Sequence, residues 1–241
     1  MINFIKVGIK KIISLISSVL FKTKIGKIAA ENFLTLSMNN FKEINYSDCK
    51  LKFVTPNWIN RYRVDTFATK EPETLDWIDS FEENSVFYDI GANVGLYSCY
   101  AAKKSKCKVY AFEPSIFNLE LLGRNIYLNE ISEKIIIIPM PLTEKMTESK
   151  FNMSSTELGS ALSTFGQKYT HDGSALINKF SYKTIGISID DAIHSLKFQQ
   201  PDYIKIDVDG IEHLIIKGGM KTIKNTKSLL IEVDEKFEEQ K

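Results

Sequence analysis

Residues 87–98 read FYDIGANVGLYS and combine one acid with two glycines directly after a short apolar run. Glycine adopts backbone conformations that other residues avoid, and it leaves the backbone open to a ligand. An apolar strand, a glycine turn and a helix form the unit with which doubly wound sheets bind cofactors. The candidate ligand contacts in this segment are Asp89, Gly91, Ala92, Asn93, Gly95 and Tyr97.

The next apolar run, residues 109–112, ends in a second acid, Glu113. An acid at the end of the second strand of such a sheet accepts hydrogen bonds from the hydroxyls of a ribose. Glu113 therefore predicts a nucleoside ligand, and we take Pro114, Ser115 and Leu142 as further contacts to it.

The glycine spacing selects among nucleosides. A dinucleotide-binding loop reads GxGxxG and leaves room for a pyrophosphate, whereas this loop reads GANVG. Asp89 would repel a phosphate and attract an ammonium group, and the helix N-terminus after Gly95 favours a carboxylate. A ribose at one end and an amino acid at the other describe S-adenosylmethionine, which we predict as the cofactor.

Ionisable groups also follow the apolar run at residues 203–206. Methyl transfer to a hydroxyl needs aligned reactants and a base for the hydroxyl proton. Asp207, Asp209 and His213 are the candidate catalytic residues, and Glu212 is a further candidate base. The structural alternatives are a helix cap for Asp207 and helix packing or surface exposure for His213.

Glu232 and Asp234 lie at the end of the apolar run 229–233. Carboxylates two residues apart can share a Mg²⁺ ion, so a metal site that includes Asp207 and Asp209 is an alternative. We expect an acidic rim without a metal.

Five apolar runs alternate with helical patterns, of which residues 117–129 and 211–224 are the clearest. Strands that alternate with helices predict an α/β fold with a Rossmann-like, doubly wound, mostly parallel sheet. Residues 143–182 are rich in Ser, Thr, Gly and Asn and show little periodicity. We expect a functional or mobile insertion there. The runs lie at residues 86–88, 109–112, 135–138, 203–206 and 229–233.

Five segments occur in order within residues 60–234: DIGANVGLYS, AFEPSIFNLELLGRNIYLN, SIDD, YIKIDVDGIEHLIIKGG and LLIEV. Together they resemble the FkbM-type methyltransferases, a branch of the S-adenosylmethionine-dependent, Rossmann-like methyltransferases. The resemblance implies transfer of the cofactor's methyl group to a hydroxyl of a small molecule or of a sugar or glycan.

Two features depart from the pattern of the family. Asp209 stands where a glutamate is common, and the chain stops soon after residues 229–233, without the last two strands of the fold. An exposed apolar edge strand promotes aggregation. We therefore expect a longer natural protein, or an edge that a partner or the N-terminal segment covers.

The chain has 241 residues and a formal net charge of +1, without a basic tract of the kind that follows a phosphate backbone. These features argue against a nucleic-acid partner. Three scattered cysteines fit a reduced, cytoplasmic setting. The length suits one methyltransferase domain, residues 46–241, after a helical extension, residues 1–45.

The N-terminus has the pattern of an amphipathic helix. Its apolar stretch, residues 12–21, is too short to span a bilayer. The helix either lies on an anionic membrane surface at the inner face or packs on the protein's own core or on a homodimer partner. The apolar face holds Ile2, Ile5, Ile9, Ile12, Ile16 and Val19, and the polar face holds Asn3, Lys6, Lys10, Ser14 and Ser17.

Two other functions stay open. A nicotinamide-dependent oxidoreductase is disfavoured by the missing GxGxxG and by Asp89. The other is a membrane-associated module that binds the cofactor without catalysis. For an active enzyme, we expect residues 55–72 and 154–172 to line the acceptor pocket.

Overall fold

The structure is a computed structural model that describes residues 2–234 and residue 237. Its helices are α1 (Ile2–Leu20), α2 (Lys24–Asn39), α3 (Trp58–Asp65), α4 (Pro72–Asp79), α5 (Leu96–Lys104), α6 (Ile116–Leu128), α7 (Ile189–Leu196), α8 (Glu212–Lys217) and α9 (Met220–Ile223). Its strands are β1 (Phe41–Tyr46), β2 (Cys49–Val54), β3 (Val86–Ile90), β4 (Lys108–Phe112), β5 (Ile135–Ile138), β6 (Thr147–Met153), β7 (Ser163–Phe165), β8 (Phe180–Gly186), β9 (Tyr203–Ile206) and β10 (Ser228–Ile231).

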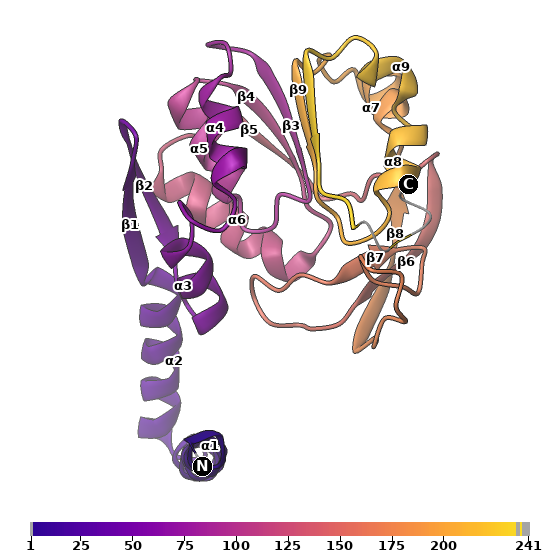
Figure 1. The fold of residues 1–241 in the computed structure, drawn as a ribbon. Helices are drawn as coiled ribbons and strands as arrows, with labels where there is room; N and C mark the ends of the chain where they lie inside the picture. Colours follow the sequence, from indigo (N-terminus) through magenta and orange to yellow (C-terminus); the bar gives the residue numbers. More distant parts are fainter. Residues whose placement is uncertain (1, 235–236, 238–241) are drawn as a thin grey trace.

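A five-stranded parallel sheet in the order β10-β9-β3-β4-β5 forms the centre of the molecule. Helices α4, α5 and α6 cover one face, and α7, α8 and α9 cover the other (Figure 1). The strand order reverses between β3 and β9, the place where doubly wound sheets bind ligands. The predicted fold is therefore confirmed, and within residues 2–234 no strand pairs with the outer side of β10.

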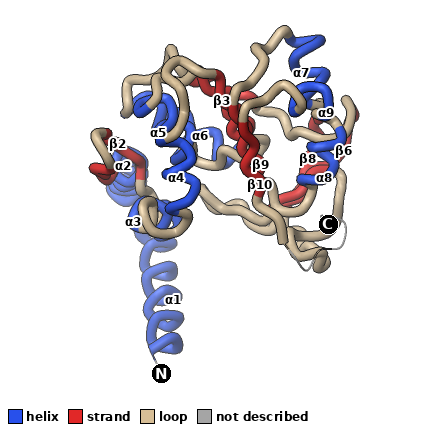
Figure 2. Tube along the Cα trace, turned by 45° about the horizontal axis from the view of Figure 1, so that its top comes forward, coloured by secondary structure: helices blue, strands red, loops and turns tan. Residues whose placement is uncertain are grey.

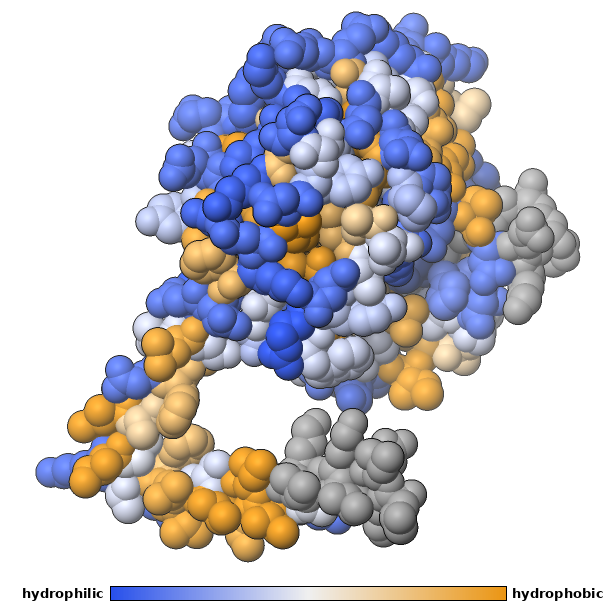
Figure 3. Space-filling model, turned by 60° about the vertical axis from the view of Figure 1, so that its left-hand side comes forward, coloured by the Kyte–Doolittle hydropathy of each residue, from blue (hydrophilic) through white to orange (hydrophobic). Residues whose placement is uncertain are grey.

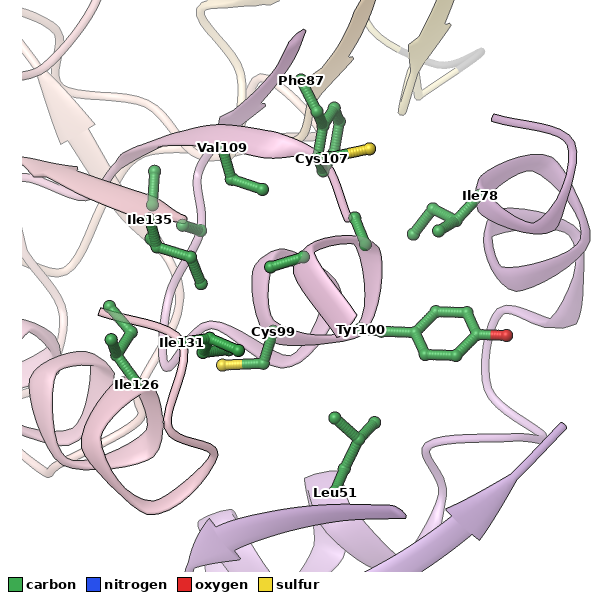
Figure 4. Close-up of a cluster of buried hydrophobic side chains, with 14 of the residues drawn as sticks. Leu51, Ile78, Phe87, Cys99, Tyr100, Cys107, Val109, Ile126, Ile131 and Ile135 are labelled. Carbon is green, nitrogen blue, oxygen red and sulfur yellow. The ribbon is translucent and has the colours of Figure 1, made fainter. Parts of the chain in front are cut away.

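The two faces of the sheet bury different side chains because successive strand residues point in opposite directions. Phe87 belongs to the core on the α5 side, whereas Tyr88 and Ile90 belong to the core on the α8 side. In the first core, side chains from the sheet and neighbouring helices surround Cys99 and Tyr100 of α5 (Figure 4). Buried parallel strands read as continuous apolar runs, which explains why the sequence located all five.

The β1–β2 hairpin spans the predicted boundary between the helical extension and the methyltransferase domain. Leu51 and Phe53 of β2 are fully buried in the core on the α5 side. The predicted boundary between residues 45 and 46 falls inside β1, whose Tyr46 pairs with Cys49. The helical extension ends at Asn39, and the hairpin belongs to the body that follows it.

The polar segment at residues 143–182 is more ordered than we expected. It contains β6 and β7, which form a three-stranded antiparallel sheet with β8 in the order β7-β6-β8. Phe151 and Met153 of β6 are buried, while the beginning of the strand is largely exposed. Because many positions of β6 are polar and exposed, its sequence lacks the alternation of apolar and polar residues that indicates a strand.

The predicted helix at residues 211–224 is divided into α8 and α9 at Gly218 and Gly219. A Cβ atom on Gly218 would lie 2.4 Å from the carbonyl oxygen of Thr143. The backbone passes too close for any larger residue, and the helix ends at this contact.

Helices α1 and α2 form an arm that extends from the body (Figures 1 and 2). The large apolar side chains described along it are exposed, and Figure 3 shows them gathered on the arm. The exposed Ile12, Ile16 and Val19 of α1 do not pack on the protein's own core, whereas the side chains of Ile2, Ile5 and Ile9 lie outside the described part of the structure. Neither helix covers the free edge of β10. None of the helices within the described residues is long and apolar enough to cross a bilayer.

Candidate cofactor and acceptor site

A cavity of about 1160 Å³ lies at the carboxyl ends of the central strands. Both segments expected at the acceptor pocket, residues 55–72 and 154–172, contribute to its wall. The predicted site residues that line it are Gly91, Asn93, Glu113, Pro114, Leu142, Asp207 and Asp209, together with the further candidate Glu212. The predicted residues that lie outside its lining are Asp89, Ala92, Gly95, Tyr97, Ser115 and His213.

Glu113 is 5% exposed and follows β4 directly. Its Oε2 accepts a hydrogen bond from the backbone N–H of Asn93 at 2.8 Å, and its Oε1 accepts one from Ser115 N–H at 2.8 Å. Burial raises the pKa of Glu113 to about 7, although these amides lower it. The carboxylate thus fixes the glycine loop. Oε2, which accepts one hydrogen bond, retains a lone pair that a ligand hydroxyl can use.

Gly91 brings the loop after β3 against the end of β9. Its φ of +85° is unfavourable for other residues, and a Cβ atom there would lie 1.8 Å from the carbonyl oxygen of Asp207. Gly95, with φ of +81°, has a different role, because its Cβ would lie 2.4 Å from Leu122 Cδ1 of α6. The first glycine shapes the cavity, and the second allows α5 and α6 to pack.

Asp89 lies beneath the loop instead of in the cavity wall. It is 1% exposed, and its Oδ2 accepts a hydrogen bond from Ser98 Oγ of α5 at 2.5 Å. Burial raises its pKa, and the charge of Lys205 opposes that rise. Lys205 Nζ also lies 5.2 Å from the ring centre of Tyr97, whose hydroxyl donates to Glu71. We predicted that Asp89 binds the cofactor directly or through water, and its position outside the cavity lining favours the contact through water.

Asp207 and Glu232 form a pair of acidic side chains at the ends of β9 and β10. Lys205 Nζ lies 2.5 Å from Asp207 Oδ2. Burial raises the pKa of Asp207, but Lys205 and a hydrogen bond with Glu232 outweigh it and lower the value to about 2. The same hydrogen bond, with the charge of Asp207, raises the pKa of Glu232 to about 8. The arrangement therefore holds one proton on two carboxyl groups at neutral pH.

The other three candidate acid–base residues have structural contacts. Asp209 Oδ2 accepts hydrogen bonds from the backbone N–H groups of Leu162 and Ser163. Glu212 accepts from Gly210 N–H and closes the turn that precedes α8. The ring of His213 lies edge-on to Phe237, and the residue is outside the cavity lining.

Residues 154–163 form a strap that crosses from the α3 side of the cavity to the glycine loop. Asn57 and Asn60 both donate from Nδ2 to the carbonyl of Leu158 at 2.9 Å. Arg63 Nε donates to the carbonyl of Gly159 at 2.9 Å. These contacts fasten one end of the strap to α3.

The other side of the strap is fastened to the cofactor loop and to α6. Asn93 Nδ2 and Asn118 Nδ2 donate to the carbonyl of Ser160 at 3.0 and 3.2 Å. Asn118 Nδ2 also reaches Glu113 Oε1 at 3.4 Å. The strap therefore connects the wall expected to hold the acceptor with the loop expected to hold the cofactor.

Comparison with known proteins identifies the family to which the chain belongs. The methyltransferase FkbM domain matches residues 89–241, which is more than half of the chain. The chain belongs to the FkbM methyltransferase family. Within this FkbM chain, the match begins at Asp89 and includes the glycine loop, Glu113 and the acidic pair.

Hexuronic acid methyltransferase AglP from Haloferax volcanii is 26% identical over 156 residues, which are 65% of this chain and 59% of that protein. The FkbM chain thus spans less than two thirds of that relative's length. A solved FkbM methyltransferase from Methylobacillus flagellatus is 18% identical, with 83% of this chain and 46% of that chain covered and a TM-score of 0.43. A precorrin-6y C5,15-methyltransferase from Geobacter metallireducens is 13% identical over 67% of this chain and 60% of that chain, with a TM-score of 0.39.

The predicted acceptor segment, residues 55–72, contributes Trp58, Tyr62 and Arg63 to the cavity wall of the FkbM chain, whereas Asn118 was not predicted. Trp58 and Tyr62 lie one helical turn apart on α3 and are 63% and 53% exposed. Arg63 and Asn118 also line the cavity and hold the strap. Asn118 lies in the first turn of the helix after Glu113, a position from which side chains reach strand ends, and this spacing was the available signal.

Metal binding was the remaining alternative for the acidic rim. Within residues 2–234 and 237, no three side chains of the His, Cys, Asp or Glu type come together as a metal site.

Proposed function

We propose that this FkbM protein binds S-adenosylmethionine and transfers its methyl group to a hydroxyl oxygen of a small molecule, sugar or glycan. One observation carries the proposal: a buried acid, Glu113, shares a cavity wall with Gly91 and with the Asp207–Glu232 pair. These groups stand where a ribose, a close backbone approach and a hydroxyl proton would each require them.

The residues of the cavity wall fit the cofactor. Asn93 Oδ1 and Ser160 Oγ are buried polar atoms that have no hydrogen-bond partner among the described residues, and both residues line the cavity. Buried polar groups of this kind favour a ligand that satisfies them. The wall also carries more carboxylates than cations, which favours a positively charged ligand.

The bound cofactor would supply a methyl group on a positively charged sulfur. Glu113 would accept hydrogen bonds from the ribose hydroxyls. Lys205 holds Asp207 in one orientation through their ion pair, and Asp207 with Glu232 would receive the proton of the acceptor hydroxyl. The strap and α3 would position the acceptor and limit the access of water.

Two observations support a sugar-like acceptor on a membrane. The relative AglP carries the name of a hexuronic acid methyltransferase. The arm in this chain exposes apolar side chains, and residues 1–30 hold six lysines and no acids. We propose a cytoplasmic protein whose arm rests on an anionic membrane surface.

Calorimetric titration of the purified protein with S-adenosylmethionine, and separately with NAD⁺, tests the proposed cofactor. We expect binding of S-adenosylmethionine and none of NAD⁺. In Glu113→Gln the affinity should fall about 10- to 100-fold, because a hydrogen bond to a charged group contributes about 1.5–3 kcal/mol.

Glu120→Gln is the matched control, because Glu120 lies on α6 with its carboxylate paired to Arg124 at the surface. Its affinity for the cofactor should equal that of the wild type. Binding of NAD⁺ in preference to S-adenosylmethionine would overturn the proposal, and so would folded protein that binds neither.

A further inference from the structure

The acidic pair, Asp207 and Glu232, lies among charged groups. These groups make Glu232 bind a proton more tightly than an isolated carboxyl group does. Glu232 faces Asp207 and Lys205 of the β9 segment and Glu71 at the start of α4. Lys70 faces both carboxylates of the pair from the same segment as Glu71. Two of these groups are acids close to Glu232, and one cation, Lys205, is already paired with Asp207.

The pair lies in the cavity wall and is accessible from it. Asp207 has a side chain that is 30% exposed, and Glu232 is an exposed residue. Gly91 of the cofactor loop contacts the backbone of Asp207, so a cofactor held by that loop lies beside the pair. A positive charge there would favour the doubly ionised state of the two carboxyl groups.

We propose that Asp207 and Glu232 are the proton store of the reaction, releasing one proton when a cationic cofactor enters and taking one back from the acceptor hydroxyl. The inference rests on the proposed function and adds that cofactor binding itself removes the proton from the pair and so prepares Glu232 to act as the base. It also predicts that cofactor affinity rises with pH until the pair is ionised in the free protein.

The charges balance through the cycle. As the new oxygen–carbon bond forms, the carbon–sulfur bond breaks and sulfur keeps both electrons, so one positive charge disappears. The hydroxyl proton moves to Glu232 at the same time, so one negative charge disappears from the pair. The net charge of the cavity is the same before and after transfer, which avoids an unpaired charge in a partly buried site.

The test is calorimetry of S-adenosylmethionine binding at pH 8.0 in two buffers with different ionisation enthalpies. The difference between the observed heats gives the number of protons released. The raised pKa of Glu232 leaves the pair partly protonated there, so we expect release of a measurable fraction of a proton per cofactor bound. Glu113, with a pKa of about 7, contributes little at this pH.

Glu232→Gln should reduce the proton release at least two-fold while the protein still binds the cofactor. Glu83→Gln, which alters an exposed glutamate paired with Lys106, is the matched control and should leave the release unchanged. In the wild type, S-adenosylhomocysteine should release fewer protons than S-adenosylmethionine, because it lacks the sulfonium charge; this arm needs no variant.

Equal proton release in the wild type and in Glu232→Gln would overturn the inference, and so would equal release with the two ligands. Both results leave cofactor binding intact, so they are distinguishable from failure of the proposed function, in which S-adenosylmethionine does not bind.

Discussion

Asp209, which follows β9, holds part of the cavity wall in place through hydrogen bonds to the strap. Its backbone has a φ of +60°, and its carboxylate accepts hydrogen bonds from two amides of the strap, at Leu162 (2.7 Å) and Ser163 (3.3 Å). Burial raises its pKa, and the two amides oppose that rise. A side chain held in this way positions the strap.

Replacing Asp209 with Ala should release this part of the strap. We expect hydrogen exchange at the amides of Leu162 and Ser163 to increase at least about ten-fold, because a hydrogen bond to a charged group contributes about 1.5–3 kcal/mol. Mass spectrometry of exchanged peptides measures the effect.

Asp209→Asn is the conservative control. Asparagine tolerates positive φ and keeps a carbonyl oxygen as acceptor, so exchange should change less than about three-fold. If Asp209→Ala left the exchange of residues 158–163 unchanged, Asp209 would not hold the strap. The other contacts of the strap, to Asn57, Asn60, Asn93 and Asn118, would then be sufficient.

For single residues, the sequence predicted which of them lie at strand ends better than it predicted the direction in which their side chains point. Glu113 and Asp207 were found because parallel strands carry their ligand-binding residues at the carboxyl ends. Asp89 and His213 lie outside the cavity lining. Asp89 is in β3 and His213 is in α8, and proximity to a strand end does not determine which face of its element a side chain occupies. Asp89 points to Ser98 of α5, and His213 points to Phe237.

Helix α1, like α2, exposes apolar side chains that no other described element covers. Ile12 and Ile16 are 60% and 54% exposed, and Ser14 and Ser17 occupy the opposite side of the helix. A helix alone in water gains little from such a pattern, because most helical stability in proteins comes from burial of the apolar face. The lysines around it provide charge complementarity to anionic lipid.

We expect the double substitution Ile12→Glu and Ile16→Glu to weaken binding to anionic lipid vesicles. Each apolar side chain contributes roughly 1.5–3 kcal/mol when fully buried, so partition should fall at least about ten-fold. Co-sedimentation with vesicles at fixed salt measures it.

The matched control, Ser14→Glu with Ser17→Glu, makes the same change in charge on the polar face. It should weaken partition less than the isoleucine pair does, because only the electrostatic part is lost. Equal losses in the two variants would contradict insertion of the apolar face. A wild type that forms dimers and ignores vesicles would assign this face to a second copy of the chain.

The elements that the sequence predicted well are the strands of the central parallel sheet. β3, β4, β5, β9 and β10 appear as short apolar runs, whereas β6 and β8 are half exposed and interrupted by lysine, serine and threonine. The pairing of β6 with β8 links residues about thirty positions apart. A local pattern cannot show such a partner, so this sheet became visible only in three dimensions.

The whole molecule has one body, with a core on each face of its central sheet, and one arm. The β1–β2 hairpin closes the core on the α5 side, where Phe53 is fully buried and packs near Phe67. Asn125 Oδ1 accepts the backbone N–H of Val54, which ties the hairpin to α6. Burial of the hairpin should therefore contribute to the free energy of unfolding. The exposed apolar side chains of α2 should contribute little to it.

Phe53→Ala should lower the free energy of unfolding by about 3–5 kcal/mol, the range for a phenylalanine removed from a packed core. Phe33→Ala makes the same change on α2, where the side chain is 70% exposed, and should stay within about 0.5 kcal/mol of the wild type. Urea denaturation followed by circular dichroism compares the two. Similar losses in both variants would mean that the arm is as integral to the fold as the hairpin.

The contact between Gly91 and the carbonyl of Asp207 has a consequence for how descendants of this protein can diverge. A methyl group at position 91 has no space whether or not a ligand is bound, because the obstruction is backbone. A lineage that abandoned methyl transfer would still be selected to retain this glycine in order to fold, while Glu232 would be free to drift. In a related sequence of unknown activity, a glycine at this position therefore indicates only that the fold is kept. An acidic pair at positions 207 and 232 is the better indication of methyltransferase activity.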